Sequence, residues 1–167
     1  MKHYTHKTFI DHRGSYTPIS TTEAGIAWEQ CSISINENIY TFRGMHYQTN
    51  PPQAKYIKVV QGKIIDFAYN IDTNHLNHMV LGTDDAVLLD NTVAHGFLTL
   101  EPNTIVAYLV LGTYNPSTEH SIVWTTIPEL KSIIDKFTEG QEITISEKDA
   151  AGKPDLQKQT NDNKLTL

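Results

Sequence analysis

Cysteine, positive charge and long apolar runs are all scarce in this chain of 167 residues. The single cysteine, Cys31, excludes an intrachain disulfide and any zinc site built from several cysteines. It also fits a reducing compartment, so we expect a cytoplasmic protein in which Cys31 is a small buried residue. The N-terminal residues Met1-Lys2-His3-Tyr4-Thr5-His6 are not followed by a long apolar run, so we expect neither a signal peptide nor a membrane span. The sequence therefore predicts a soluble protein without a membrane partner.

Acidic residues outnumber basic ones by 19 to 13, which gives a formal net charge of −6. This balance argues against general nucleic-acid binding, although a few cations can still gather around one anionic ligand. We therefore favour a small-molecule partner. A length of 167 residues predicts one domain, residues 1–167, large enough to bury a core without disulfides or metal. We expect its polar tail, from about residue 155, to be mobile.

Short apolar and β-branched runs separated by turn residues dominate the chain as far as Tyr114, a pattern typical of strands. Gln61-Gly62 separates two of these runs and predicts a tight hairpin, because glycine readily adopts positive φ. Apolar residues at three- and four-residue steps predict one helix, residues 128–137. We expect an all-β jelly-roll sandwich or barrel with a short C-terminal helix. The expected strands are residues 27–35, 39–48, 55–60, 63–70, 79–81, 86–89, 95–100 and 104–111.

The segment Arg43-Gly44-Met45-His46-Tyr47-Gln48 places a guanidinium, an imidazole and a carboxamide close together in strand-like sequence. Side chains alternate along an extended strand, so His46 is expected to share a face with Phe42, Gly44 and Gln48. A histidine with an ordinary pKa of about 6.5 can exchange a proton near neutral pH. The segment alone does not distinguish a catalytic base from a core histidine bonded to a carbonyl.

A second histidine, His95, begins another expected strand, and Tyr108 follows it in the next one. A histidine base facing a tyrosine acid can invert a carbon beside a carbonyl, because hydrogen leaves from one face and returns on the other. Spacing alone does not bring these residues together. Tyr108 stands in an apolar run and also fits a core residue with a satisfied hydroxyl.

Small β-barrels often hold a metal ion on two or three histidines and a carboxylate. Such sites typically begin with His-x-His followed by a glutamate, whereas this chain has His46-Tyr47-Gln48 and no glutamate between His46 and Gly62. His75 and His78 lie in a polar, turn-like segment that we interpret as solvated surface. The sequence therefore predicts no catalytic metal.

Several short motifs follow one another between residues 11 and 149. They are Asp11-His12-Arg13-Gly14, Gln30-Cys31-Ser32-Ile33-Ser34, Arg43-Gly44-Met45-His46-Tyr47-Gln48, Gln53-Ala54-Lys55, Gly62-Lys63-Ile64-Ile65-Asp66-Phe67-Ala68, Ala94-His95-Gly96-Phe97, Tyr108, Tyr114-Asn115-Pro116 and Ser146-Glu147-Lys148-Asp149. In this order and near this spacing they resemble the dTDP-4-dehydrorhamnose 3,5-epimerases, which are cupin-type nucleotide-sugar epimerases.

The resemblance implies a cupin jelly-roll barrel, that is, a double-stranded β-helix. It implies an isomerase that inverts C3, C5 or both of a nucleotide-linked 4-keto-deoxy sugar through an enolate. The nucleotide would be dTDP or another nucleotide, and the pathway would supply sugars for a surface polysaccharide such as lipopolysaccharide or capsule. The reaction needs a base, an acid and a cation at the enolate, so the expected cofactor list is empty.

The resemblance also implies roles for single residues. His46 is similar to the family's base, Asp149 to the carboxylate that orients it, and Tyr108 to the acid on the opposite sugar face. Lys55 resembles the cation that stabilises the enolate, and a fixed charge at a developing oxyanion can lower a barrier substantially. Arg13 resembles an arginine lent to the neighbouring subunit, which implies a homodimer with exchanged N-terminal strands. The remaining substrate-binding positions would be Gln30, Arg43, Gln48, Asp66, His95 and Tyr114.

The chain departs from the family pattern mainly at nucleotide-binding positions. Ser32 stands in place of an asparagine, and Ser15-Tyr16-Thr17-Pro18 replaces an aromatic run with a glutamate. Asn70-Ile71-Asp72 replaces a run ending Asp-x-Arg. The base of the nucleotide and the length of the sugar therefore stay open, as do two alternatives. A keto-sugar isomerase on the same fold would move the ketone between C3 and C4, and a catalytically silent cupin would bind a nucleotide sugar without turning it over.

Overall fold

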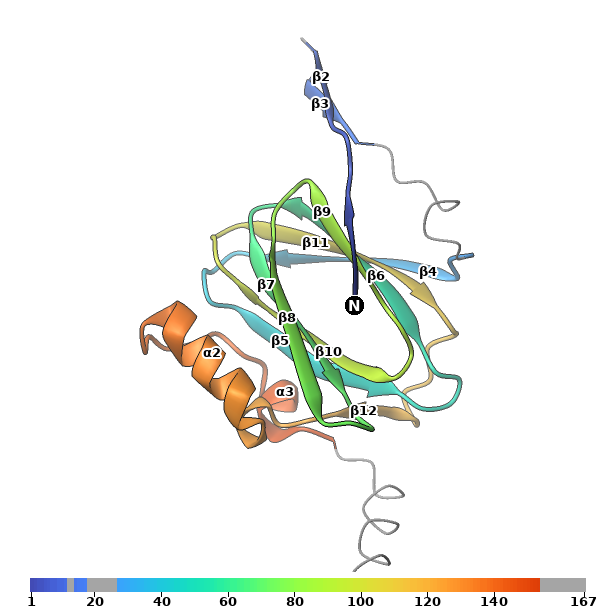
Figure 1. Cartoon of the computed structure of the whole chain (residues 1–167), viewed down its shortest axis with the longest axis vertical. Coiled ribbons are helices and arrows are strands. Elements are labelled where there is room, and N and C mark those ends of the chain that lie inside the picture. The colour runs from blue at the N-terminus through green and yellow to red at the C-terminus, as the bar shows by residue number, and fades with distance from the viewer. Residues whose placement is uncertain (12–13, 18–26, 154–167) are drawn as a thin grey trace, which may run out of the picture.

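Two five-stranded antiparallel sheets make up most of the chain in the computed structural model, which describes residues 1–11, 14–17 and 27–153 (Figure 1). The first sheet has the strand order β1-β9-β6-β11-β4, and the second has the order β12-β5-β10-β7-β8. The strands are β1 Lys2–Thr5, β2 Phe9–Asp11, β3 Gly14–Tyr16, β4 Gln30–Asn36, β5 Phe42–Gln48, β6 Ala54–Gln61, β7 Ile64–Asn70, β8 His75–Leu81, β9 Asp85–Leu89, β10 Val93–Thr99, β11 Thr104–Leu111 and β12 Glu119–Ser121.

The two sheets face each other and enclose the barrel interior, which confirms the predicted jelly roll (Figure 1). Alternation along the strands decides which side chains enter this interior. On β10, for example, His95 and Phe97 point inward, whereas Ala94 and Leu98 pack on the outside of the second sheet. The apolar part of the interior consists of Ile57, Val59, Ile64, Ala68, Leu81, Val87, Leu89, Phe97 and Val106.

The predicted helix is confirmed as α2 Pro128–Thr138, and it covers the outer face of the second sheet (Figure 1). Pro128 occupies its first turn, where the missing N–H costs nothing, and Glu139 ends it in the left-handed conformation. Leu130 and Ile134 are buried against Phe42, Met45, Tyr47, Ile65 and Phe67 of the sheet. Two further helical turns are η1 Trp124–Thr126 and α3 Glu147–Ala151. The pattern of α3 is too short for sequence periodicity to reveal.

The predicted hairpin at Gln61-Gly62 is wrong. Gly62 does adopt positive φ, at 80°. However, β6 pairs with β9 and β11, whereas β7 pairs with β8 and β10, so the turn crosses from one sheet to the other. The same turn residues suit a hairpin and a connection between two sheets, because the chain reverses its direction in both. Only the pairing partners of the two strands distinguish them.

The structure also differs from the sequence predictions at Cys31 and in the segment containing His75 and His78. Cys31 is exposed rather than buried, because β4 is an edge strand of the first sheet and no other described segment covers its outward face. The segment containing His75 and His78 is not a turn but strand β8, an edge strand of the second sheet. Both histidines are exposed, as predicted.

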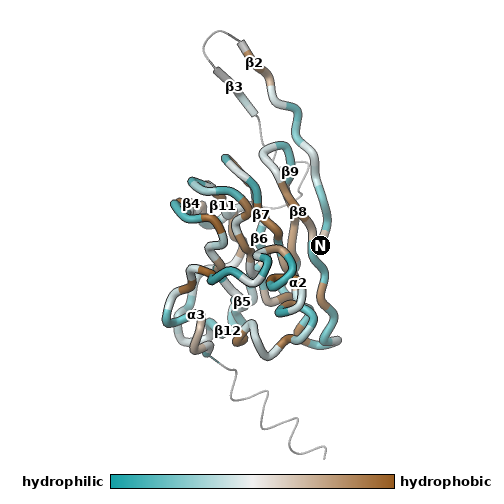
Figure 2. The backbone as a smooth tube through the Cα atoms, turned by 90° about the vertical axis from the view of Figure 1, so that its left-hand side faces the viewer, coloured by the Kyte–Doolittle hydropathy of each residue, from teal (hydrophilic) through white to brown (hydrophobic). Residues whose placement is uncertain are grey.

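Strands β2 and β3 pair with each other and extend beyond the barrel (Figures 1 and 2). Their exposed apolar side chains include Ile10, which is 81% exposed, and Tyr16, which is 68% exposed. The tail predicted from about residue 155 lies outside the described residues. Within the described part of the chain, no helix has the length and apolar character needed to cross a membrane.

Candidate active site

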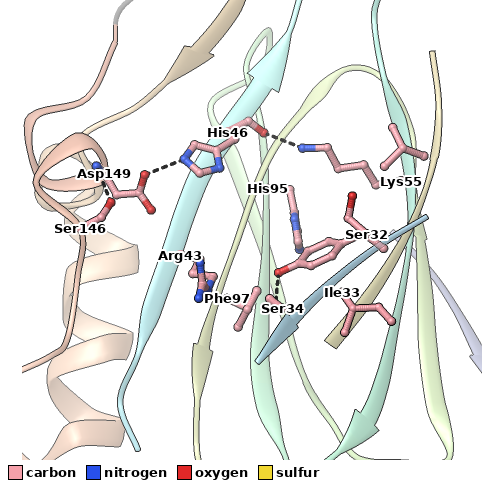
Figure 3. Close-up of a pocket in the computed structure, with 12 residues that line it drawn as sticks. Ser32, Ile33, Ser34, Arg43, His46, Lys55, His95, Phe97, Ser146 and Asp149 are labelled. Carbon is pink, nitrogen blue, oxygen red and sulfur yellow. Dashed lines mark hydrogen bonds and ion pairs between the residues drawn. The ribbon is translucent and has the colours of Figure 1, made fainter. Parts of the chain in front are cut away.

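A cavity of about 380 Å³ lies between the two sheets, next to the apolar core (Figure 3). Phe97 belongs both to that core and to the cavity wall. Tyr108 and Lys55 come from the first sheet, and His46 and His95 from the second. A β-barrel of this size can hold one small ligand between its sheets. The polar and charged residues of the lining are Ser32, Ser34, Arg43, His46, Lys55, His95, Tyr108, Ser146 and Asp149.

The orientation of His46 differs from the predicted alternation. His46 and Arg43 both line the cavity, whereas Phe42 packs on the outside of the sheet beneath α2. The reason is a register shift between β5 and β10, where His95 pairs with His46 but Phe97 pairs with Arg43. Two residues of β5, Gly44 and Met45, therefore oppose Gly96 alone, and such a bulge reverses the alternation beyond it.

Glycine is required on both strands at this bulge. Gly44 has a φ of 133°, and a Cβ added there would collide with the backbone of Gly96. A Cβ added at Gly96 would lie 2.7 Å from the Met45 sulfur and 2.9 Å from the Arg43 carbonyl oxygen. The glycines of the Arg-Gly-Met-His and His-Gly-Phe motifs thus serve one close approach of two strands.

His46 is hydrogen-bonded to Asp149, with 2.9 Å between Nε2 and Oδ1 (Figure 3). The second carboxylate oxygen of Asp149 accepts the backbone N–H of Gly44 at 3.2 Å. Ser146 caps α3 by accepting the N–H of Asp149, which holds that residue in place. An ionised carboxylate only accepts hydrogen bonds, so Nε2 carries the proton and Nδ1 is the basic nitrogen.

Asp149 is an effective partner because its ionised form is favoured. Burial by itself would raise the pKa of Asp149, and the side chain is only 8% exposed. The hydrogen bond and charge of His46, with contributions from Gly44 and Ser146, outweigh burial and hold this pKa below its ordinary value. The carboxylate therefore stays charged and stabilises the imidazolium that forms when His46 takes a proton.

His95 forms a second histidine–carboxylate pair, which local sequence pattern did not reveal. Its Nε2 lies 2.7 Å from Oδ2 of Asp66, and both side chains are buried. Asp66 was expected as a substrate contact, but it is fully buried and stands behind His95 rather than in the cavity lining. The feature that could have indicated this pair is the inward position of Asp66 on β7, where Asp66 pairs with Phe97 of β10.

Lys55 enters the cavity from β6, and its ammonium donates to the carbonyl oxygen of His46 at 3.5 Å (Figure 3). Desolvation lowers the pKa of Lys55 to about 8, although the negative charges of Glu119 and Asp66 oppose that shift. The ammonium is therefore charged at neutral pH and poorly solvated. Such a cation interacts strongly with an oxyanion that develops beside it.

Tyr108 faces the cavity from β11, where its hydroxyl lies 3.1 Å from the Ser34 hydroxyl. Burial raises the pKa of Tyr108 to about 12, while the Ser34 hydrogen bond and the charge of Arg43 oppose the shift. Its ring packs edge-on against His95, with the centroids 6.5 Å apart. The phenol therefore carries its proton at neutral pH and can act as an acid.

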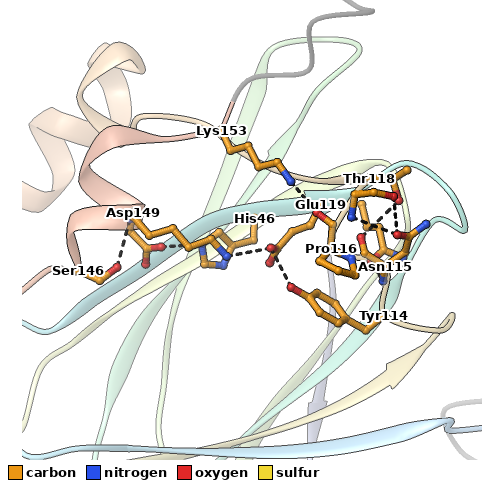
Figure 4. Close-up of polar contacts among 12 residues, drawn as sticks. His46, Tyr114, Asn115, Pro116, Thr118, Glu119, Ser146, Asp149 and Lys153 are labelled. Carbon is orange, nitrogen blue, oxygen red and sulfur yellow. Dashed lines mark hydrogen bonds and ion pairs between the residues drawn. The ribbon is translucent and has the colours of Figure 1, made fainter.

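A polar cluster at β12 holds α3, and the sequence motifs did not include its central residue, Glu119 (Figure 4). Glu119 accepts hydrogen bonds from Tyr114 at 3.1 Å and from Lys148 at 2.8 Å. Lys153 joins the same strand through backbone bonds to Ser121 at 2.8 and 2.9 Å. Because Lys148 and Asp149 are neighbours, these contacts help to fix the carboxylate that faces His46.

Three other predicted binding residues in the described part of the chain are not among those that line the cavity: Gln48, Gln30 and Tyr114. Gln48 is buried and ties loops together, donating to Pro51 and Thr113 and accepting from Asn115. Gln30 is exposed and donates to Ser32 at 2.7 Å. Tyr114 is 49% exposed and points at Glu119. Arg13 lies outside the described residues.

No group of three or more histidine, cysteine, aspartate or glutamate side chains is arranged to hold a metal ion in residues 1–11, 14–17 and 27–153. The cavity lining itself supplies acids, bases and cations. Two histidines, one charged lysine and one protonated phenol surround a single space. This set can remove a proton from a carbon acid, stabilise the resulting anion and return a proton.

Comparisons with known proteins show the family to which this chain is similar. The family model described as dTDP-4-dehydrorhamnose 3,5-epimerase matches residues 1–157. The Mycobacterium tuberculosis dTDP-4-dehydrorhamnose 3,5-epimerase is 35% identical over 132 residues, which cover 72% of this chain and 61% of that protein. The aligned part of the chain thus spans about three fifths of the length of this relative.

Two solved structures have the same fold. The dTDP-4-dehydrorhamnose 3,5-epimerase of Bacillus anthracis, with TDP and PPi bound, has a TM-score of 0.75 and 26% identity, covering 92% of this chain and 93% of that one. The dTDP-6-deoxy-D-glucose-3,5-epimerase of Legionella pneumophila, in complex with dTDP-4-keto-L-rhamnose, has a TM-score of 0.77 and 25% identity. The alignment covers 89% of this chain and 84% of the Legionella protein.

Proposed function

The chain belongs to the dTDP-4-dehydrorhamnose 3,5-epimerase family, and we propose that it inverts C3, C5 or both of a nucleotide-linked 4-keto-deoxy sugar. The observation that carries this proposal is that His46 and Tyr108 line one cavity from strands of the two facing sheets. A base and an acid that approach a flat enolate from different sides are what inversion requires. The bound dTDP-sugar of the Legionella protein supports a ligand of the same class.

The proposed reaction begins at the carbon next to the 4-keto group. The ketone acidifies the hydrogens at C3 and C5, because the electron pair left by proton removal delocalises onto the ketone oxygen. Nδ1 of His46 takes the proton, and the Asp149 carboxylate stabilises the imidazolium. The Lys55 ammonium stabilises the oxyanion of the enolate. Tyr108 then donates its proton to the opposite face of the same carbon.

Further residues would contribute to substrate binding. Arg43 and His95 line the cavity and would contact the substrate, whereas Asp66 would act by orienting His95. Gln30, Gln48 and Tyr114 would act at the cavity mouth or through neighbouring loops.

The sugar would serve a surface polysaccharide such as lipopolysaccharide or capsule. We place the enzyme in the cytoplasm, where activated nucleotides for sugar synthesis are available.

We also propose a homodimer in which Arg13 reaches the partner's site. Apolar side chains exposed on the first sheet and on β2–β3 support this arrangement: Ile33, Ile35, Val60, Phe9, Ile10 and Tyr16. Clusters of exposed apolar residues commonly mark protein interfaces. Sedimentation should give a dimer at micromolar protein concentration, and Ile33→Lys with Ile35→Lys should weaken it. A stable wild-type monomer would contradict this arrangement.

Incubation with a panel of nucleotide 4-keto sugars in deuterium oxide tests the activity. We expect deuterium at C3, C5 or both, together with inverted product seen by NMR. Movement of the ketone to C3 would identify a keto-sugar isomerase. Binding of a nucleotide sugar without exchange or conversion would identify a silent binding protein.

A further inference from the structure

A chain of hydrogen bonds runs from Arg43 to Tyr108 through two residues of β4. Arg43 Nε donates to Oδ1 of Asn36 at 2.7 Å. Nδ2 of Asn36 lies 3.4 Å from the Ser34 hydroxyl, which lies 3.1 Å from the Tyr108 hydroxyl. Tyr108 pairs with Ser32 and Val106 pairs with Ser34, so Ser34 is a diagonal neighbour of Tyr108 on the inward face.

The chemistry of the partners decides which atom donates and which accepts at each step of these hydrogen bonds. A guanidinium N–H can only donate, so the Asn36 atom facing Arg43 is the amide oxygen. A carbonyl can only accept, and the Thr104 carbonyl lies 3.0 Å from Nδ2 on the other side of Asn36. The remaining N–H of Asn36 then points at Ser34. Ser34 accepts from Asn36 and has its own hydrogen available for the Tyr108 oxygen.

Proton transfer in the proposed reaction changes the charge of Tyr108. The substrate C–H bond breaks, its proton goes to His46, and its electron pair enters the enolate. The enolate carbon then takes the Tyr108 proton, and the O–H electron pair stays on the phenol oxygen as phenolate. A buried phenolate is costly unless donors surround it. The charged or titratable groups around Tyr108 are Arg43, His46, Lys55, Asp66, His95 and Asp149.

We propose that Ser34, oriented by Asn36 and Arg43, donates a hydrogen bond to Tyr108 and stabilises the phenolate formed when Tyr108 protonates the substrate carbon. Ser34 is thus a positioning residue that acts through the acid. This inference rests on the proposed epimerase function for its role in turnover. The hydrogen-bond chain itself does not depend on the identity of the sugar.

The first test measures Tyr108 without substrate. Ring-fluorinated tyrosine lowers the pKa of the phenols, so their titration is followed by fluorine NMR while the protein stays folded. The Tyr108 signal is the one missing from the Tyr108→Phe variant. In Ser34→Ala the titration midpoint of Tyr108 should move to higher pH, because a donor to the phenolate is lost. An unchanged midpoint would overturn the proposal, whether or not any sugar is converted.

The matched control is Ser32→Ala. Ser32 has the same side chain on the same face of β4, lines the same cavity and is bonded to Gln30 rather than to Tyr108. Its loss should leave the Tyr108 midpoint in place. Ser34→Thr keeps a hydroxyl and suits a strand, so it should restore the wild-type midpoint. A shift of equal size in both alanine variants would indicate a general change in the cavity and would contradict the role of Ser34.

The second test measures turnover. Ser34→Ala should slow inversion roughly 10- to 100-fold, the range for a hydrogen bond to a charged group. Hydrogen exchange by His46 with retention should change much less. In the Tyr108→Phe background, Ser34→Ala should cause no further loss of inversion. Equal losses of exchange and inversion in Ser34→Ala would show that Ser34 acts on the fold rather than on the acid.

Discussion

His46 of β5 and His95 of β10 are cross-strand partners, and each is hydrogen-bonded through Nε2 to its own carboxylate. Asp149 supports His46 at 2.9 Å, and Asp66 supports His95 at 2.7 Å. The two pairs differ in burial, because the side chain of His46 is 27% exposed and that of His95 is 5% exposed. The more accessible pair, His46 with Asp149, is better placed to meet a substrate proton.

We predict that His46→Asn abolishes hydrogen exchange at both C3 and C5. General base catalysis typically contributes about 10²–10⁴-fold, and asparagine has no basic nitrogen. His95→Asn, which can still donate to Asp66, should keep measurable exchange and raise KM. Deuterium incorporation from heavy water measures both variants. Near wild-type exchange by His46→Asn would show that another residue is the base.

Removal of the Tyr108 hydroxyl should separate exchange from inversion. Tyr108→Phe preserves the ring that packs against Phe97 and His95, so loss of stability should be small. We expect deuterium to enter with retention, returned by His46, while inversion falls by about 10²–10⁴-fold. Chiral analysis of the labelled sugar measures the two rates. Undiminished inversion would leave Tyr108 only a packing role.

Activity should fall at alkaline pH as Lys55 loses its proton. Desolvation lowers the pKa of Lys55 to about 8, so the ammonium is charged below that pH and neutral above it. The cation at the enolate is therefore lost as the pH rises. We expect kcat/KM, which reports the free enzyme, to decline near pH 8. Lys55→Arg should move this decline to higher pH, because arginine stays charged.

Glu119→Gln offers a matched test of the same assignment. The Glu119 charge raises the pKa of Lys55, so its removal should shift the alkaline decline of kcat/KM to lower pH. Glu101→Gln removes an equal charge from an exposed pair with Lys63 and should not shift the profile. If the decline stayed in place in both Lys55→Arg and Glu119→Gln, it would belong to another group.

The bulge predicts a contrast between two glycines. Gly96→Ala would place a methyl group 2.7 Å from the Met45 sulfur, and overpacking of this kind typically costs about 1–3 kcal/mol. At Gly82 a methyl group would meet nothing closer than 3.8 Å, so Gly82→Ala should be neutral or stabilising by about 0.4–1 kcal/mol. Urea unfolding at one protein concentration measures both. Equal stability of the two variants would be inconsistent with this packing.

Local pattern in the sequence was sufficient for α2 and for the barrel strands β4, β5, β6, β7, β9, β10 and β11. It did not reveal β1, β2, β3, β12 or the first half of β8. Alternating and three- to four-residue periodicities arise from the backbone geometry of strands and helices, so they can be read without knowing any contact. The family motifs predicted which residues form the site. The structure brings six of these residues to one cavity: His46, Asp149, Tyr108, Lys55, Arg43 and His95.

Tertiary structure alone decided which way these side chains point and what supports them. One extra residue in β5 reverses the alternation and turns His46 into the barrel, and periodicity carries no sign of that bulge. The partners Asp66 with His95, Ser34 with Tyr108 and Glu119 with Lys148 are far apart in sequence. Strand pairing between and within the two sheets sets those distances, and no local pattern records which strands will pair.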